Sequence, residues 1–263
     1  MKRFTDRVAV VTGGSTGIGR ACAQEFAAEG AAVVIADVNE GQGAELAASI
    51  EAAGGQALFQ RTDVAREESV ARMVAVACER FGGVDCLVNS AAVQTYGSVV
   101  TTDEDTWDRT IDVNLKGIYL AARHCIPSMA ARGGGAVVSI ASVQGIMSQP
   151  DVAAYAATKG AIIAMTRTMA LDHAGEGVRV NAVSPGSIDT PMLRESARLF
   201  SPEAVEETVE SWGELHPLGR VGQPREIARA VLFLCSEDAS FMTGANVVVD
   251  GGLSIGLFSP AGD

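Results

Sequence analysis

The chain has 263 residues, of which 48% are hydrophobic and 29 are glycine, and its formal net charge is -12 at pH 7. This length is enough for one large α/β domain with a substantial core. The negative charge argues against nucleic acid or an anionic membrane as a partner, and the sequence has no apolar run of about 18 residues that could span a bilayer.

The cysteines and histidines do not indicate a disulfide framework or a metal site. The five cysteines are dispersed without a Cys-x-x-Cys pair, and the three histidines are widely separated. Dispersed cysteines of this kind are typical of buried thiols in a reducing compartment. Residues 1–6 lack the apolar segment of a signal peptide. We therefore expect a cytoplasmic protein without a metal ion.

Seven short apolar runs alternate with segments of helical periodicity. The runs occupy residues 8–11, 33–36, 57–60, 86–88, 136–140, 178–183 and 247–249. Continuous apolar strands are typical of a parallel sheet that is buried on both faces. Their alternation with helices predicts an α/β, Rossmann-like, doubly wound fold: a seven-stranded parallel sheet with helices on both faces. No linker or repeat divides the chain, so we predict a single domain over residues 1–263.

Residues 187–223 interrupt this alternation with a long insertion between the sixth and seventh strands. The insertion contains a predicted helix at 202–212, for which Ser201 is a suitable N-cap and Pro202 a suitable first residue. A connection of this length is either a surface excursion or a binding element. We interpret it as a substrate lid.

The first strand leads into a glycine-rich turn and then directly into a helix. The turn, residues 12–19, has the sequence TGGSTGIG, with glycines at 13, 17 and 19. Such glycines let the backbone turn sharply and approach a ligand, and the free N–H groups of the following helix bind a pyrophosphate. A purely structural tight turn is the alternative. The spacing differs from the Gly-x-Gly-x-x-Gly of the longer dehydrogenases.

Asp37 ends the second strand. A carboxylate at this position can accept hydrogen bonds from the adenosine ribose hydroxyls, and it would repel a 2′-phosphate. Thr16 stands where a basic side chain would favour the phosphate, and Val38 follows the aspartate. These observations favour NAD over NADP. The alternative role for Asp37 is that of a helix N-cap near Asn39.

Tyr155 and Lys159 are four residues apart, so on a helix they share one face. A nearby positive charge lowers the pKa of a phenol, which is otherwise near about 10. A tyrosine tuned in this way can take a proton from an alcohol or return one to a carbonyl. Taken alone, the pair could equally be two unrelated residues on a solvated helix face.

These motifs occur in an order that resembles the single-domain branch of the short-chain dehydrogenase/reductase family, and the resemblance covers essentially the whole chain. After the glycine turn come Asp63-Val64, Asn89-Ser90-Ala91-Ala92, Asn114, Ser142, Tyr155 with Lys159, Asn181, Pro185-Gly186, Ile188-Asp189-Thr190 and Val249-Asp250-Gly251-Gly252. One departure is visible at Ser90 and Ala92, where family members commonly have Asn-Asn-Ala-Gly.

The resemblance implies roles for four residues in the chemistry. Tyr155 would be the general acid/base, and Lys159 would lower its pKa and bind the nicotinamide ribose. Ser142 would hold the substrate oxygen and stabilise the charge that develops there. The side chain of Asn114 would help to hold a water that connects the lysine to solvent as a proton relay.

The resemblance also implies the cofactor site. Asp63 and Val64 would contact the adenine, Asn89 and Ala91 the adenine ribose, and the segment after the sixth strand the nicotinamide end. The full predicted set is Gly13, Ser15, Thr16, Gly17, Ile18, Gly19, Asp37, Asp63, Val64, Asn89, Ala91, Tyr155, Lys159, Pro185, Gly186, Ile188 and Thr190.

We therefore predict an NAD-dependent oxidoreductase that interconverts a secondary alcohol and a ketone. The substrate pocket is expected from residues 94–98, 143–152 and 187–216, including His216, and it fits an aldose, a cyclic diol, a hydroxysteroid or a 3-oxoacyl thioester. A non-catalytic NAD(H)-binding sensor would have lost part of the Ser/Tyr/Lys/Asn set, which is intact. An extended-family epimerase or dehydratase would have a differently spaced glycine turn.

The apolar C-terminal segment, residues 253–258, would be a liability on the surface of a monomer. Members of the family that the chain resembles are usually tetramers or dimers. We therefore predict a homo-oligomer in which this segment packs across a subunit interface and closes a neighbouring site.

Overall fold

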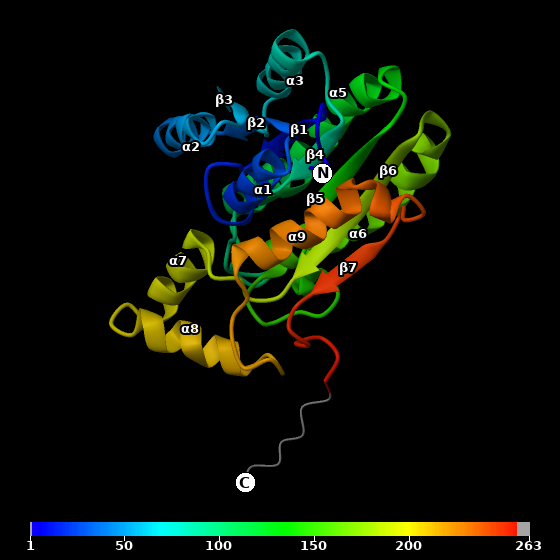
Figure 1. The fold of residues 1–263 in the computed structure, drawn as a ribbon. Helices are drawn as coiled ribbons and strands as arrows, with labels where there is room; N and C mark the ends of the chain where they lie inside the picture. The colour runs from blue at the N-terminus through cyan, green and yellow to red at the C-terminus, as the bar shows by residue number, and fades with distance from the viewer. Residues whose placement is uncertain (1, 257–263) are drawn as a thin grey trace.

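The computed structural model describes residues 2–256, which form one seven-stranded parallel sheet with helices on both faces (Figure 1). The strand order is β3-β2-β1-β4-β5-β6-β7. This arrangement confirms the predicted Rossmann-like fold. Each end of every predicted apolar run lies within two residues of the corresponding end of an observed strand. The strands are β1 (Val8–Thr12), β2 (Ala32–Asp37), β3 (Gln56–Arg61), β4 (Cys86–Asn89), β5 (Gly135–Ile140), β6 (Val178–Pro185) and β7 (Asn246–Val249).

Helices cover both faces of the sheet because successive strand residues point to opposite sides. In β1, Val11 packs into the core beneath α1, α2 and α9, whereas Val10 packs into the core beneath α3 and α5. Both valines are fully buried. The helices are α1 (Gly17–Ala28), α2 (Glu40–Ala52), α3 (Glu67–Phe81), α4 (Glu104–Ile111), α5 (Gly117–Ala131), α6 (Ala153–His173), α7 (Pro191–Phe200), α8 (Val205–Glu214) and α9 (Pro224–Cys235).

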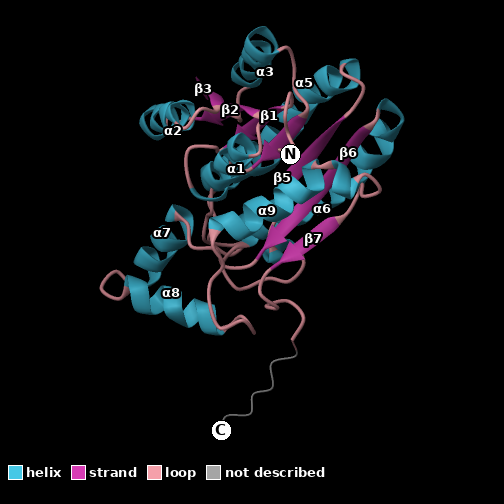
Figure 2. Ribbon diagram, viewed as in Figure 1, coloured by secondary structure: helices cyan, strands magenta, loops and turns pink. Residues whose placement is uncertain are grey.

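The insertion between β6 and β7 holds two helices where the sequence predicted one. Figure 2 shows α7 and α8 beyond the ends of the strand arrows, apart from the two helix layers. The predicted helix at 202–212 is wrong at its start: Ser201 is the C-cap of α7, and α8 begins only at Val205. The Ser201 N–H donates to the Ala197 carbonyl, so Ser201 still belongs to the last turn of α7 and cannot begin the next helix.

Thr190 and Pro191 supply the start signal of α7. The Thr190 hydroxyl accepts a hydrogen bond from the Leu193 N–H, and Pro191 is the first residue of α7. Proline suits this position because its missing N–H would be unpaired there anyway. At the base of the insertion, Gly222 pairs with both Ser187 and Asp189 through backbone hydrogen bonds of 2.8 and 2.9 Å.

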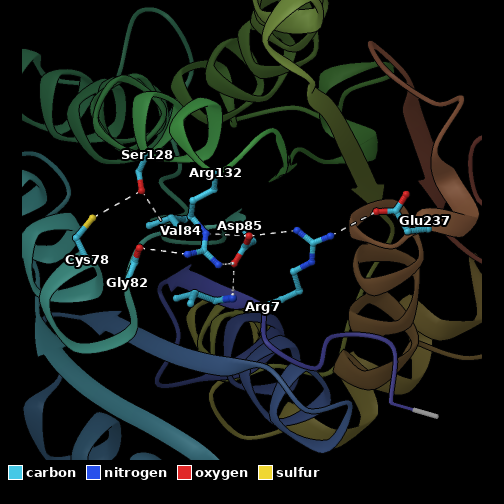
Figure 3. A network of polar contacts seen from close by, with 9 residues as sticks. Arg7, Cys78, Gly82, Val84, Asp85, Ser128, Arg132 and Glu237 are labelled. Atoms are coloured by element: carbon cyan, nitrogen blue, oxygen red, sulfur yellow. Dashed lines mark hydrogen bonds and ion pairs between the residues drawn. The ribbon is translucent and has the colours of Figure 1, made fainter.

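A buried carboxylate ties the amino ends of the central strands together (Figure 3). Asp85, which directly precedes β4, is only 3% exposed. Its oxygens accept hydrogen bonds from the Val8 N–H at 2.8 Å, from Arg7 at 3.2 Å and from Arg132 at 3.0 and 3.1 Å. Arg132 also binds the Gly82 carbonyl at 3.2 Å. The cluster therefore connects the start of β1, the start of β4 and the end of α5.

None of the helices in residues 2–256 has the length and apolar character needed to cross a membrane.

Candidate active site

A cavity of about 1290 Å³ lies over the carboxyl ends of the strands, between the sheet and the insertion helices. Open α/β sheets bind their ligands at this edge. Most of the predicted site residues line the cavity: Gly13, Thr16, Gly17, Ile18, Asp37, Asp63, Val64, Ala91, Ser142, Tyr155, Lys159, Pro185, Gly186, Ile188 and Thr190. Four predicted residues lie behind its wall, namely Ser15, Gly19, Asn89 and Asn114.

The glycine turn keeps a shape that other residues would not adopt. Gly13 and Gly17 have φ angles of 62° and 52°, which favour glycine. A Cβ on Gly19 would lie 2.0 Å from the Gly13 carbonyl oxygen, so the turn could not close on α1. No side chain caps the first turn of α1, and no acidic residue lies in it. The N–H groups at this helix end therefore fit the pyrophosphate of a dinucleotide.

Asp37 lies in the cavity wall and is oriented by the glycine turn. One carboxylate oxygen accepts hydrogen bonds from the Ser15 N–H at 3.1 Å and the Ser15 hydroxyl at 2.5 Å, and the other accepts the Asn39 N–H at 3.0 Å. The alternative role of Asp37 as a helix cap is wrong, because Asn39 caps α2 by accepting the Gln42 N–H. Ser15 therefore positions Asp37 from behind the wall.

Asn89 and the loop that follows it are fixed to neighbouring strands. Asn89 is buried in β4, and its amide donates to the Ser139 hydroxyl of β5 at 3.1 Å. The Thr12 hydroxyl accepts the N–H groups of Ser90 and Ala91 at 3.2 and 3.4 Å. These bonds hold the loop against the glycine turn although its sequence departs from the usual family pattern.

Tyr155 and Lys159 lie in α6, and Ser142 follows β5. The Lys159 ammonium is buried, lies 5.3 Å from the centroid of the Tyr155 ring and donates to the Ile140 carbonyl at 2.8 Å. Burial lowers the pKa of Lys159 to about 7, because a charged amine loses its hydration there.

The pKa of Tyr155 moves against the expected direction. Burial raises the pKa of Tyr155 to about 12, and a hydrogen bond with the Ser142 side chain opposes this rise only in part. Desolvation of the phenol dominates its pKa, and the lowering predicted from Lys159 is wrong. At neutral pH Tyr155 is a neutral phenol, which is the form that donates a proton to a carbonyl.

Asn114 lies in a π-helical turn, Asp112–Lys116, between α4 and α5. Its side chain is fully buried, accepts the Val93 N–H at 2.8 Å, and donates to the Val93 carbonyl at 2.9 Å and the Thr158 hydroxyl at 3.3 Å. Asn114 thus fixes the loop after β4 to α6, one residue before Lys159. Both amide protons are used, so this side chain has only acceptor capacity left for a water.

Four residues that no sequence motif indicates line the cavity beside the insertion helices. Tyr96, Ser196, Phe200 and Leu215 all line it. Tyr96 fell within a segment that was expected to contribute, but nothing in the sequence showed that its ring would meet Phe200. These contacts join segments about a hundred residues apart, which local patterns do not report.

His216 does not line the cavity, and this prediction is wrong. The imidazole is 3% exposed, and Nε2 accepts the Ser187 N–H at 3.1 Å. Nδ1 lies 2.9 Å from the Trp212 carbonyl, which can only accept, so this nitrogen carries the proton. His216 therefore connects the end of α8 to the segment after β6, where the resemblance puts the nicotinamide.

A family model, curated relatives and solved structures each match this chain over nearly its whole length. The family model described as Enoyl-(Acyl carrier protein) reductase matches residues 13–254. The cis-4-hydroxycyclohexanecarboxylate dehydrogenase of Sinomonas cyclohexanicum is 41% identical over 250 residues, which cover 95% of this chain and 97% of that protein. Other relatives are named as dehydrogenases of cyclohexanol and of a dichlorinated cyclohexadienediol.

Two solved structures are similar over almost the whole chain. The aldohexose dehydrogenase of Thermoplasma acidophilum has a TM-score of 0.88 and 36% identity, and the match covers 100% of this chain and 98% of that one. Levodione reductase has a TM-score of 0.91 and 35% identity, with coverage of 95% and 98%.

Proposed function

Because the chain belongs to the short-chain dehydrogenase/reductase family, we propose that it is an NAD-dependent oxidoreductase that interconverts a secondary alcohol and a ketone. One observation carries the proposal: Ser142, Tyr155 and Lys159 line the same cavity as the glycine turn and Asp37. A proton-transfer group and a dinucleotide cradle thus share one site, which is what hydride transfer to or from a carbinol carbon requires.

The protein supplies the acid/base and positioning part of this reaction. NAD, when bound, supplies the hydride acceptor or donor. The Ser142 hydroxyl holds the substrate oxygen, and Tyr155 gives a proton to that oxygen in reduction or takes it in oxidation. Lys159, held by the Ile140 carbonyl, stabilises the phenolate that oxidation requires. The insertion helices α7 and α8 exclude water from the reacting atoms.

The preference for NAD over NADP rests on Asp37. Its carboxylate lines the cavity and is fixed by Ser15, so a 2′-phosphate would meet a negative charge that cannot easily rotate away. Thr16 and Val38, which also line the cavity, offer no compensating cation.

Two substrate classes have specific support. The relatives named for cyclohexanols and hydroxycyclohexanecarboxylates favour a ring alcohol. The structural similarity to an aldohexose dehydrogenase, together with Gln94, Gln144 and Gln149 in the cavity wall, favours a sugar as second candidate. An acyl thioester has less support, because the net charge of -12 would repel an acidic carrier.

We also propose that the protein is a homo-oligomer, either a tetramer or a dimer. Val99, Val100 and Phe241 are each more than 80% exposed, as is Ile255 of the C-terminal segment. Leu253 of that segment lines the cavity of its own chain, whereas Leu257 and Phe258 lie outside the described residues. A truncation after Gly252 tests the role of the segment: unchanged oligomeric state and kinetics would contradict it.

The decisive test of the reaction is Tyr155→Phe, assayed by NADH absorbance over a panel of polyols, aldoses, steroids and keto-esters. The variant keeps the ring but has no proton to exchange. We expect turnover to disappear while NADH binding, followed by fluorescence, is retained. Turnover at the wild-type rate in the variant would refute the assignment.

A further inference from the structure

Three aromatic side chains from separate elements form one wall of the cavity, here called the aromatic wall: Tyr96, Phe200 and Trp212. Tyr96 follows β4, Phe200 ends α7 and Trp212 belongs to α8. The Tyr96 and Phe200 ring centroids are 5.0 Å apart at 88°, and those of Phe200 and Trp212 are 6.3 Å apart at 82°. Edge-to-face pairs of this kind are mutually stabilising and leave ring surface free for a ligand.

The aromatic wall is held in place although two of its members belong to the insertion. Arg194 of α7 binds both oxygens of Asp189, at 2.7 and 3.1 Å, and also Glu206 of α8 at 2.6 Å. The Tyr96 hydroxyl accepts a hydrogen bond from the Gln94 amide at 2.8 Å. Phe200 nevertheless remains 56% exposed, which is unusual for a phenylalanine that already packs against two rings. An apolar ligand would cover this surface.

Few charged side chains line the cavity. Those among the described lining residues are Asp37, Asp63, Arg109, Asp112 and Lys159. Asp37 ends β2 and Asp63 follows β3, on the half of the sheet opposite to β5 and β6.

Arg109 lies in α4 and Asp112 in the π-helical turn that follows it, where the Asp112 carboxylate pairs with Lys116 at 3.1 Å. Lys159 is bound to the Ile140 carbonyl. The segments expected to form the substrate pocket, residues 94–98, 143–152 and 187–216, are here called the substrate half. The polar side chains that they contribute to the cavity wall are all uncharged.

We propose that the substrate presents an uncharged, apolar ring to the aromatic wall, and that this wall sets substrate specificity. This inference rests on the proposed alcohol/ketone function and narrows it. A buried carboxylate needs a cation or several donors as partners, and the substrate half supplies no cation. The chain thus differs in expected substrate from its relative named for a hydroxycyclohexanecarboxylate. A free aldohexose has hydroxyl groups around its whole ring, and the aromatic carbon of the wall offers none of them a hydrogen-bond partner.

The first test compares three substrates of the wild-type enzyme with NAD: cyclohexanol, 4-hydroxycyclohexanecarboxylate and glucose. We expect kcat/KM for cyclohexanol to exceed the other two by about tenfold or more, which is the cost of one poorly solvated polar group. A higher kcat/KM for the carboxylate or for glucose would overturn the proposal while leaving the alcohol/ketone function intact.

The second test changes the wall itself. Phe200→Ala should lower kcat/KM for cyclohexanol about tenfold, mainly through KM, because the variant removes ring contact and not chemistry. Phe200→Leu should recover part of the loss. Leu199→Ala is the matched control, since Leu199 is an exposed neighbour on α7 that does not line the cavity. Equal KM values in Phe200→Ala and Leu199→Ala would contradict the proposed wall.

A binding measurement separates this proposal from the reaction. Cyclohexanone and 4-oxocyclohexanecarboxylate are titrated into the wild-type protein with NADH present, and NADH fluorescence is followed. Tighter binding of cyclohexanone supports the uncharged-ring assignment even if no alcohol is turned over, an outcome that would count against the proposed function alone. Equal or tighter binding of the carboxylate refutes the assignment.

Discussion

The buried charged groups at the two ends of the parallel sheet differ in how many hydrogen-bond partners they have. At the amino ends, the Asp85 carboxylate is surrounded by two guanidinium groups and a backbone N–H (Figure 3). At the carboxyl ends, the Lys159 ammonium is equally buried but has one carbonyl oxygen as its partner, and none of the ion pairs within residues 2–256 includes it.

This difference separates a stabilising cluster from a reactive one. A buried charge with a full set of partners fixes the surrounding strands. A buried charge with few partners costs stability, but its pKa shifts into the range where proton transfer is useful. The low pKa of Lys159 and the high pKa of Tyr155 follow from such sparse solvation. Changes at each end should therefore affect different observables.

The largest effect on turnover is expected for Lys159→Met. General acid/base groups contribute about 10²–10⁴-fold in rate, and we expect a loss of this size in kcat. Because the substitution removes a poorly solvated charge, the same variant should gain stability in its cofactor-free form. The measurements are steady-state kinetics and urea unfolding at pH 7. Lys116→Met, which breaks only an exposed pair with Asp112, should change neither by much.

The pH dependence of that stability gain has a definite sign. The pKa of Lys159 is lowered from 10.5 to about 7 on folding, so the unfolded chain binds this proton more tightly. The cost to the wild type is full below pH 7 and disappears as the pH rises toward 10.5. The stability difference between Lys159→Met and wild type should therefore be greatest at or below pH 7, on the order of a few kcal/mol. A difference that grows with pH would contradict this account.

Asp85→Ala should have the largest effect on stability among single changes at the amino ends. It removes the acceptor that Arg7, Arg132 and the Val8 N–H share, and loss of one partner from a buried ion pair costs about 3–5 kcal/mol. Urea unfolding measures the loss, and kcat of the folded fraction should stay at the wild-type value. Glu237→Gln is the control, because Glu237 is 90% exposed and lies 3.7 Å from Arg7.

The sheet was predictable from sequence, whereas the insertion was not. Buried parallel strands are continuous apolar runs, and the glycine turn and Asp37 follow directly from strand ends. In the insertion, Thr190-Pro191 and Ser201-Pro202 are equally good helix starts by local rules, and the structure uses only the first. The choice depends on tertiary contacts such as that of Phe200 with Tyr96.

The same reason explains the errors within the site. His216 has the polarity of a pocket residue, but its partners are backbone groups of Ser187 and Trp212 that no side-chain pattern reports. The pKa of Tyr155 was predicted from its charged neighbour alone, because spacing gives proximity and not burial. Desolvation, the larger effect, is visible only once α6 is packed against the sheet.

Asp37→Ser tests the choice between NAD and NADP at the carboxyl end of β2. Removing the carboxylate takes away both the acceptor for the ribose hydroxyls and the repulsion of a 2′-phosphate. We expect the ratio of kcat/KM for NAD over NADP to fall by about 10–100-fold, equivalent to about 1.4–2.7 kcal/mol. Asp37→Glu keeps the charge and should retain a preference for NAD. An unchanged ratio in the serine variant would show that Asp37 does not select the cofactor.

The smallest of these effects is expected at His216. This residue lies near the carboxyl ends of the strands, and both of its ring nitrogens have a hydrogen-bond partner. In His216→Phe the Ser187 N–H loses its acceptor, a change that costs about 1–2 kcal/mol when the group stays buried. Because Ser187 lies between Gly186 and Ile188 in the cavity wall, the loss should appear as a several-fold higher Kd for NAD with kcat nearly unchanged.

His173→Phe is the control for that variant, since the His173 imidazole lies 3.1 Å from the Glu176 carboxylate and does not line the cavity. Equal Kd values for NAD in His216→Phe and His173→Phe would show that His216 supports the fold without positioning the cofactor segment.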